Sequence, residues 1–185
     1  MNHLATSKED ILAASRDLLK ENGWAAVSIR AVASRCSVPA GTIYNYYESK
    51  ADLLSDTIES IWHEIFFHPE DEQIFHDVET CISWIYERLE YGNRQFPGFF
   101  SLHSFGFMRD EKTSGKKRMM KTWGHILNGL CEVLGNDPKV RADVFDQEFT
   151  EKKFADILFS LILVSMIRQD YDPSSVLMLV KKTLY

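Results

Sequence analysis

Between Ser37 and Lys50 the sequence SVPAGTIYNYYESK gathers three Tyr, one Asn, one Gly and one Lys into 14 residues. The amide of Asn45 can form two hydrogen bonds to one adenine. The hydroxyls of Tyr44 and Tyr46 can donate to phosphate oxygens, which positions a protein without reading sequence. Lys50 opens the next predicted helix, so its charge adds to a helix N-terminus that attracts phosphate. The segment therefore has the chemistry of a nucleic-acid contact.

Three further residues of this segment suit the same task. Small Ala40 and Gly41 let the backbone approach a base edge or a phosphate closely, and Thr42 offers both a hydroxyl and a methyl group. Tyr47 is different, because it lies three residues after Tyr44 and four after Ile43. We expect Tyr47 to be a core residue.

Short helices must position these side chains. A first helix is predicted after a cap at Thr6 or Ser7, with Gly23 at its end. Ser28 can cap a short second helix, and Pro39 can open a third over residues 41–47. Two short helices joined by a tight turn behind a longer helix form a helix-turn-helix, whose second helix enters the major groove of DNA.

The stretch LLKENGWAAVSIRAVASRCSVPAGTIYNYYESKADLL, residues 18–54, resembles the DNA-binding domain of tetracycline-repressor-like (TetR family) transcriptional regulators. The shared features are a Gly before an aromatic residue, a Ser cap, the run G-T-aliphatic-Tyr, and Ser-Lys followed by Leu-Leu. Three departures stand out. Cys36-Ser37 replaces the usual Ala-Gly, Pro39 replaces Ser, and no Arg or Lys lies between Pro39 and Tyr47. Readout of guanine by an Arg of this helix is therefore not available.

The resemblance implies a set of residues that face DNA, some contacting phosphates and some the bases. These are Ser28, Arg30, Ala40, Gly41, Thr42, Tyr44, Asn45, Tyr46 and Lys50.

Helical spacing of apolar residues continues to the end of the chain, with no alternating strand pattern. We expect an all-α fold of about nine helices in two domains. Residues 1–54 form a three-helix head whose helix-turn-helix spans about 28–47, and residues 55–185 form a helical bundle for regulation and dimerisation. Ile157–Ile167 is apolar on nearly every side, so one face is free for a second copy. The predicted interface of a two-fold dimer consists of Leu158, Leu161, Ile162, Ser165, Val176, Val180 and Leu184.

Large side chains are abundant in the middle of the chain, and a binding site for an apolar or aromatic small molecule is predicted there. A solid core would use the same residues. The candidate pocket residues are Trp84, Tyr86, Phe99, Phe100, His103, Phe105, Met119, Met120 and Trp123.

The net charge of −6 conceals an asymmetry, since residues 1–50 carry +1 and the remainder −7. A polyanion would therefore meet the N-terminal part first. Three distant cysteines and scattered histidines predict no disulfide, metal or cofactor. The longest apolar stretch has 11 residues, too short to span a membrane, so a cytoplasmic protein is expected.

These features favour a DNA-binding regulator, a repressor released from its operator by a small-molecule effector. The alternative is a helical ligand-binding or enzymatic protein whose head no longer binds DNA. No paired carboxylates, nucleophile motif or metal-ligand spacing favours catalysis, so the chain is not expected to be an enzyme.

Overall fold

A computed structural model of the chain describes residues 6–66, 76–100 and 114–185, the side chains of 114–122 excepted. Within these ranges it is all-helical, with eight α-helices and one 3₁₀ helix against the nine helices predicted. The helices are α1 (Lys8–Asn22), η1 (Trp24–Ala26), α2 (Ile29–Arg35), α3 (Ala40–Tyr44), α4 (Lys50–Phe66), α5 (Val78–Gln95), α7 (Ser114–Asn136), α8 (Glu151–Arg168) and α9 (Ser174–Leu184).

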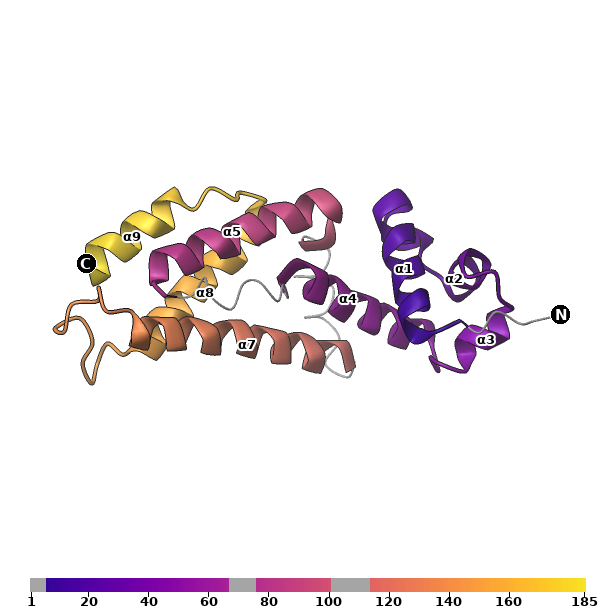
Figure 1. Cartoon of the computed structure of the whole chain (residues 1–185), viewed down its shortest axis with the longest axis horizontal. Coiled ribbons are helices and arrows are strands. Elements are labelled where there is room, and N and C mark those ends of the chain that lie inside the picture. The colour runs from indigo at the N-terminus through magenta and orange to yellow at the C-terminus, as the bar shows by residue number, and fades with distance from the viewer. Residues whose placement is uncertain (1–5, 67–75, 101–113) are drawn as a thin grey trace.

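The molecule is elongated, with a small head at one end and a helical bundle at the other (Figure 1). Helices α1, α2 and α3 form the head, while α5, α7, α8 and α9 form the bundle. Helix α4 runs from one to the other, packing on α1 in the head and on α5 and α7 in the bundle. The predicted domain boundary at residues 54 and 55 therefore lies inside a continuous helix.

The first helix begins and ends where the sequence predicts. Ser7 is its N-cap and forms a capping box with Asp10, each side chain bonding the backbone N–H of the other residue. Gly23 ends the helix with φ 73°, a conformation that residues with a side chain rarely adopt. Ile11 and Leu19 then lie on the buried face, which holds α1 against its neighbours.

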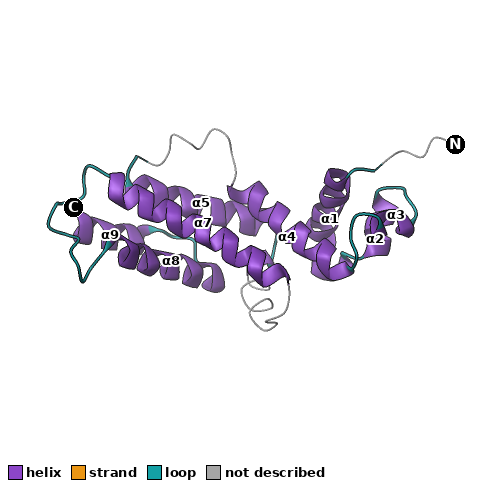
Figure 2. Cartoon of the chain, turned by 90° about the horizontal axis from the view of Figure 1, so that it is seen from below, coloured by secondary structure: helices purple, strands orange, loops and turns teal. Residues whose placement is uncertain are grey.

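In the bundle, α8 packs on α7 and α9 packs on α5. Figure 2 shows α8 and α9 along the same side of the bundle, its lower edge in that view. The segment between α7 and α8 consists of turns, such as the one in which the Asp146 carboxylate accepts the N–H groups of Glu148 and Phe149. Side-chain bonds of this kind favour a turn over a helix.

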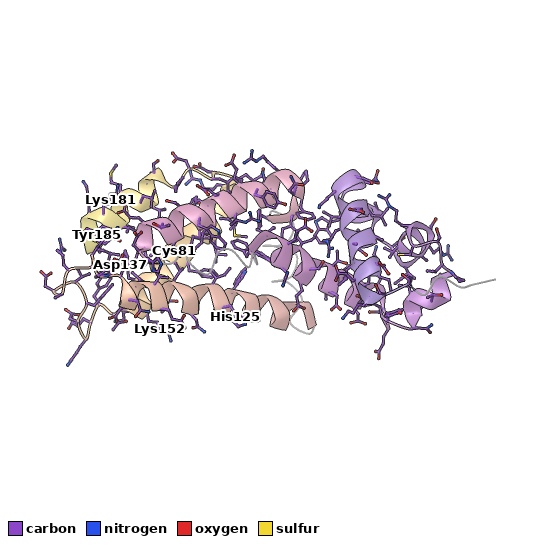
Figure 3. The ribbon with its side chains drawn as sticks, in the orientation of Figure 1. Cys81, His125, Asp137, Lys152, Lys181 and Tyr185 are labelled. Atoms are coloured by element: carbon purple, nitrogen blue, oxygen red, sulfur yellow. The ribbon has the colours of Figure 1, made fainter. Side chains whose placement is uncertain are left out.

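The end of the bundle farthest from the head is held by a polar cluster (Figure 3). The buried carboxylate of Asp137, just after α7, accepts the Val78 N–H at 3.0 Å and the Tyr185 hydroxyl at 2.5 Å. Lys139 pairs with Asp77, the N-cap of α5, at 2.8 Å. These contacts join the ends of α5, α7 and α9.

Among the described residues, no helix is both long enough and apolar enough to cross a membrane.

Candidate nucleic-acid interface

The first helix of the helix-turn-helix is set by Ser28. Its hydroxyl accepts the N–H of Ala31 at 3.2 Å, as expected for an N-cap, and its side chain is half-buried. Ile29, Val32 and Ala33 face the core. Arg30 points away from the core and is exposed at the start of α2.

The turn between α2 and α3 explains how Ser37 replaces the usual Gly. Ser37 has φ 56°, in the left-handed region. Its N–H bonds the carbonyl of Ser34 at 3.1 Å, and the Val38 N–H bonds that of Ala33 at 3.0 Å. This pair of bonds is a Schellman motif, in which the left-handed residue is most often Gly. The turn therefore keeps its geometry with a less suitable residue.

Helix α3 is shorter than predicted, ending at Tyr44 instead of residue 47. The N–H groups of Tyr46 and Tyr47 both bond the carbonyl of Ile43, which closes the helix in a turn. Ile43 and Tyr47 are buried, the latter at 3% exposure, so the prediction of Tyr47 as a core residue is confirmed. Tyr44 is 57% exposed and lies opposite this buried side.

The other predicted residues in and just after α3 are wholly or partly exposed. Gly41 and Asn45 are exposed, and Ala40 and Thr42 are half-buried. A Cβ at Gly41 would meet nothing within 4 Å, so its lack of a side chain leaves the surface flat for a partner.

Tyr46 differs from Tyr44 in its hydrogen bonding. Its ring is 43% exposed, but its hydroxyl donates to the backbone carbonyl of Thr6 at 2.6 Å. A phenol has one O–H to donate. In this structure Tyr46 therefore joins the segment before α1 to the end of α3, while Tyr44 has no such bond among the described residues.

Lys50 is the first residue of α4 and is exposed. Ser49 caps this helix, because its hydroxyl accepts the Asp52 N–H at 3.2 Å. The ammonium group of Lys50 thus lies at the positive end of a helix, where phosphate binds favourably.

Ion pairing separates the cations of the head into two groups. Four of them pair with carboxylates: Lys8 with Asp56, Arg16 and Lys20 with Glu64, and Arg35 with Glu21. Arg30 and Lys50 form no ion pair with any described residue. Both cations belong to the set of residues that the resemblance assigns to DNA contact.

Five of the nine predicted pocket residues are described with their side chains, and three of these five join one aromatic cluster around Trp62 and Phe66. Phe99 and Phe100 are fully buried, and each packs against Trp62 of α4. Trp84 contacts Phe66, and Trp123 contacts Phe159. Tyr86 is buried and shares a 2.9 Å hydrogen bond with Ser165. His103 and Phe105 lie outside the described residues, as do the side chains of Met119 and Met120.

The structure corrects the choice of dimer residues. Five of the seven predicted residues are buried within the chain itself, out of reach of a second copy: Leu158, Ile162, Val176, Val180 and Leu184. Leu161 is half-buried, and Ser165 faces Tyr86.

A different set of apolar residues on the same two helices is exposed. Their exposed fractions are 38–57%, and they are Ile157, Val164 and Ile167 on α8 and Met178 and Leu179 on α9. Sequence analysis missed them because α8 is apolar all round, so helical spacing cannot say which face is inside.

No group of three or more His, Cys, Asp or Glu side chains among the described residues is arranged to hold a metal ion.

Comparison with known proteins is consistent with this geometry. Residues 11–57 match the family described as "Bacterial regulatory proteins, tetR family". No curated protein sequence matches the chain.

Solved structures resemble the whole chain at low identity. Escherichia coli NemR in its reduced form is 17% identical, with 96% of this chain and 97% of that chain covered and a TM-score of 0.66. A transcriptional regulator from Rhodococcus sp. Rha1 is 17% identical, with 91% and 86% covered and a TM-score of 0.63. FadR from Bacillus subtilis, in complex with stearoyl-CoA, is 18% identical, with 97% and 100% covered and a TM-score of 0.59.

The match covers the same helices that present the exposed Tyr44, Asn45 and Lys50, and the bundle behind them has the fold of these regulators. Residues 11–57 are therefore similar to the N-terminal domain of the tetR family of bacterial regulatory proteins, and the whole chain shares the fold of the solved regulators.

Proposed function

We propose that the protein regulates transcription as a dimer that binds operator DNA through two heads and is released by a small-molecule effector. The observation that carries this proposal is the exposed surface of the helix-turn-helix. Arg30, Tyr44, Asn45 and Lys50 lie on it, exposed and without a side-chain bond to another described residue.

Each of these side chains has a role that its chemistry suits. Asn45 is the residue for base readout, by two hydrogen bonds to adenine. Tyr44, Arg30 and Lys50 are suited to phosphates, which supply affinity and set the register on the duplex. Gly41 gives the DNA backbone room to approach. With a single base-reading amide at the end of α3 in each head, specificity requires two heads on two half-sites.

Dimerisation supplies the second head. The exposed apolar residues of α8 recur at Ile157, Val164 and Ile167, which places them on one stripe of the helix. Met178 and Leu179 continue an exposed apolar surface on α9. Packing two copies about a two-fold axis would bury both stripes and hold the heads for half-sites about 34–36 Å apart, or a multiple of that distance.

The effector we propose is apolar or aromatic and binds in the bundle. Two buried polar atoms there have no hydrogen-bond partner among the described residues, the indole N–H of Trp123 and the hydroxyl of Tyr171. Such atoms are available to a ligand's polar group. The stearoyl-CoA bound to FadR shows that this fold can hold a long apolar chain. The effector acts only through its different affinities for the two head spacings, and a shift from 1:99 to 99:1 needs about 10⁴-fold.

The test is selection of bound sequences from a random duplex DNA library by the purified protein. We expect a two-fold symmetric sequence with adenine at the position read by Asn45. The Lys50→Ala variant should bind all sequences more weakly and lower the salt slope by about 0.9 for each phosphate that the lysine no longer neutralises. The Asn45→Ala variant should relax the base preference at one position in each half-site.

If no sequence is enriched, and wild type is retained on DNA no better than Lys50→Ala, then the head does not bind DNA and the chain is a helical ligand-binding protein.

A further inference from the structure

The head touches the bundle at a second place besides the continuous helix α4. Trp24 of η1 stacks on Phe99 with ring centroids 6.0 Å apart and an angle of 18° between the planes. The ammonium group of Lys20, near the end of α1, lies 4.6 Å from the centre of the Phe96 ring. Phe96 and Phe99 belong to the segment that follows α5, which is a turn at 96–98 and helical again at 99–100, and both are fully buried. We call residues 96–100 the α5 turn.

Charged contacts tie the same region together. Glu64 of α4 accepts from Arg16 at 3.1 Å and from Lys20 at 2.9 Å, both on α1. From the other side, Arg88 of α5 donates to the backbone carbonyls of Glu64 and Ile65 at the end of α4. The side chains of Arg16 and Glu64 are only 16% and 28% exposed, so solvent screens their pair less than a surface pair. Helices α1, α4 and α5 therefore meet at Glu64.

The packing of α5 on α4 links this meeting point to the α5 turn. A Cβ at Gly92 would lie 2.6 Å from the Ile65 side chain and 2.9 Å from Phe100. A side chain at this position would therefore clash. Because Gly92 has none, the backbone of α5 packs directly against both α4 and the α5 turn. A movement of α5 along its axis must then displace Ile65, Phe100 or both, because such interiors are close-packed.

We propose that the α5 turn is a second mechanical connection to the head, so that the position of the helix-turn-helix follows α5 directly as well as through α4. A displacement of α5 would reach the head at Trp24. This residue lies three positions before Val27, which is buried in the head and precedes α2. Phe96 and Phe99 are positioning residues that never touch DNA. The regulatory meaning of this connection rests on the proposed function, but its existence does not.

Two matched pairs of variants test the connection by hydrogen exchange of the full-length protein without DNA. Phe99→Leu removes the stacked partner of Trp24. Its control, Phe149→Leu, also trims an aromatic ring of the bundle, but one that packs on Phe145 and Phe154 near the start of α8. We expect amide exchange in α2 to accelerate about fivefold or more in Phe99→Leu and to stay within about twofold of wild type in Phe149→Leu.

The second pair works from the head toward the bundle, because coupling between two sites is reciprocal. Lys20→Met keeps the length of the side chain but removes its charge from Glu64 and Phe96. Lys8→Met makes the same change at a lysine of α1 that pairs with Asp56 at 2.5 Å and lies 5.7 Å from the centre of the Tyr47 ring. Only Lys20→Met should accelerate exchange of the Phe96 and Phe99 amides, which bond the carbonyls of Gly92 and Phe96 at 2.8 and 3.0 Å.

A double-mutant cycle separates the direct route from one that passes through Trp62 and α4. If Trp24 and Phe99 act on each other, Trp24→Leu and Phe99→Leu together should accelerate α2 exchange less than the product of their single effects. The proposal is overturned if the two effects multiply, or if each variant matches its control.

DNA binding provides the separate regulatory readout. Phe99→Leu should change affinity for the selected operator by about threefold or more while the salt slope stays constant, because the number of neutralised phosphates does not change. If wild type selects no DNA, the regulator function fails while the exchange results still decide whether the connection exists.

Discussion

The head and the bundle differ in the kind of side chain that they leave exposed. The head leaves polar side chains exposed, Tyr44, Asn45 and Lys50 among them. The bundle joins its polar groups to one another at its far end, as Asp137 does with Tyr185, and leaves apolar side chains such as Val164 exposed. Exposed polar groups suit a hydrated, charged partner, whereas exposed apolar groups suit a protein surface. This difference supports the proposed function, in which the head binds DNA and the bundle binds a second copy of the chain.

The largest expected effect on operator affinity comes from substitutions in the exposed apolar surface of the bundle. Val164→Glu combined with Met178→Glu would place two charges in the proposed dimer interface, which they cannot enter without losing hydration. We expect a folded monomer in sedimentation velocity and a loss of operator affinity of about 100-fold or more, because the two heads no longer bind together. Ala142→Glu, at an exposed position before α8, is the control. A double variant that remains dimeric would refute the assigned surface.

The next effect concerns the far end of the bundle. Asp137→Ala leaves the Val78 N–H and the Tyr185 hydroxyl without their acceptor. We expect a loss of roughly 2–4 kcal/mol in the free energy of unfolding and a fall in Tm of about 5–15 °C, with the selected DNA sequence unchanged. Asp143→Ala removes an exposed carboxylate nearby and should change stability by less than about 0.5 kcal/mol. Equal melting temperatures for the two variants would mean that the polar cluster does not hold the helix ends.

Two tyrosines of the head test whether exposure alone identifies a DNA contact. Tyr44→Phe should weaken DNA binding by about tenfold and leave stability unchanged, because only one hydrogen bond to phosphate is removed. Tyr46→Phe should lower the free energy of unfolding by about 1 kcal/mol, because its hydroxyl bonds Thr6 in the free protein. Chemical denaturation measures the free energy of unfolding of each variant, and operator titration measures its DNA affinity. An unchanged stability for Tyr46→Phe, together with weaker DNA binding, would assign its hydroxyl to phosphate instead.

The ion pair at the far end predicts how stability depends on pH. The hydrogen bond from Lys139, together with the Thr80 N–H, lowers the pKa of Asp77 to about 2. Because the folded-state pKa is below the unfolded value, this carboxylate stabilises the fold above about pH 4, and the contribution is lost as pH falls toward 2. Asp77→Asn keeps an N-cap for α5 and removes the charge, so it should cost roughly 1–2 kcal/mol at about pH 7 and almost nothing at about pH 2.

Lys139→Met is the partner control for this pH dependence. Since the lysine is the largest cause of the lowered pKa, its removal should flatten the pH profile in the same range. Urea denaturation of both variants between about pH 2 and pH 7 measures the effect. A profile that stays parallel to wild type in both variants would contradict the assignment.

The smallest expected effect compares one backbone conformation at two places. Ser37 in the head and Gln169 at the end of α8 have φ 56° and 54°, and each is the left-handed residue of a Schellman motif. Replacing either with Gly should relieve strain and raise the free energy of unfolding by about 0.5 kcal/mol, the gain being partly offset by unfolded-state entropy. DNA affinity should respond only to Ser37→Gly, which lies between α2 and α3. If Gln169→Gly changed DNA affinity as much as Ser37→Gly, the assignment of DNA binding to the head alone would be wrong.

Local features were predictable from the sequence because they involve residues a few positions apart. The predicted caps at Ser7 and Ser28 each bond a backbone N–H three residues on, and the structure contains both. The left-handed turn at Ser37 agrees with the family resemblance, in which Gly is usual at this position.

The tertiary structure decided what depends on residues far apart in the chain. Glu64 neutralises Lys20, 44 positions away, and the Tyr46 hydroxyl reaches Thr6, 40 positions away. No spacing rule predicts which of several equivalent cations or hydroxyls finds a partner at such separations. The orientation of α8 has the same origin, since a helix that is apolar on every side has no preferred inner face until its neighbours pack against it. The sequence by itself therefore determined the helix-turn-helix and its residue types, while the fold decided which side chains remain free to bind a partner.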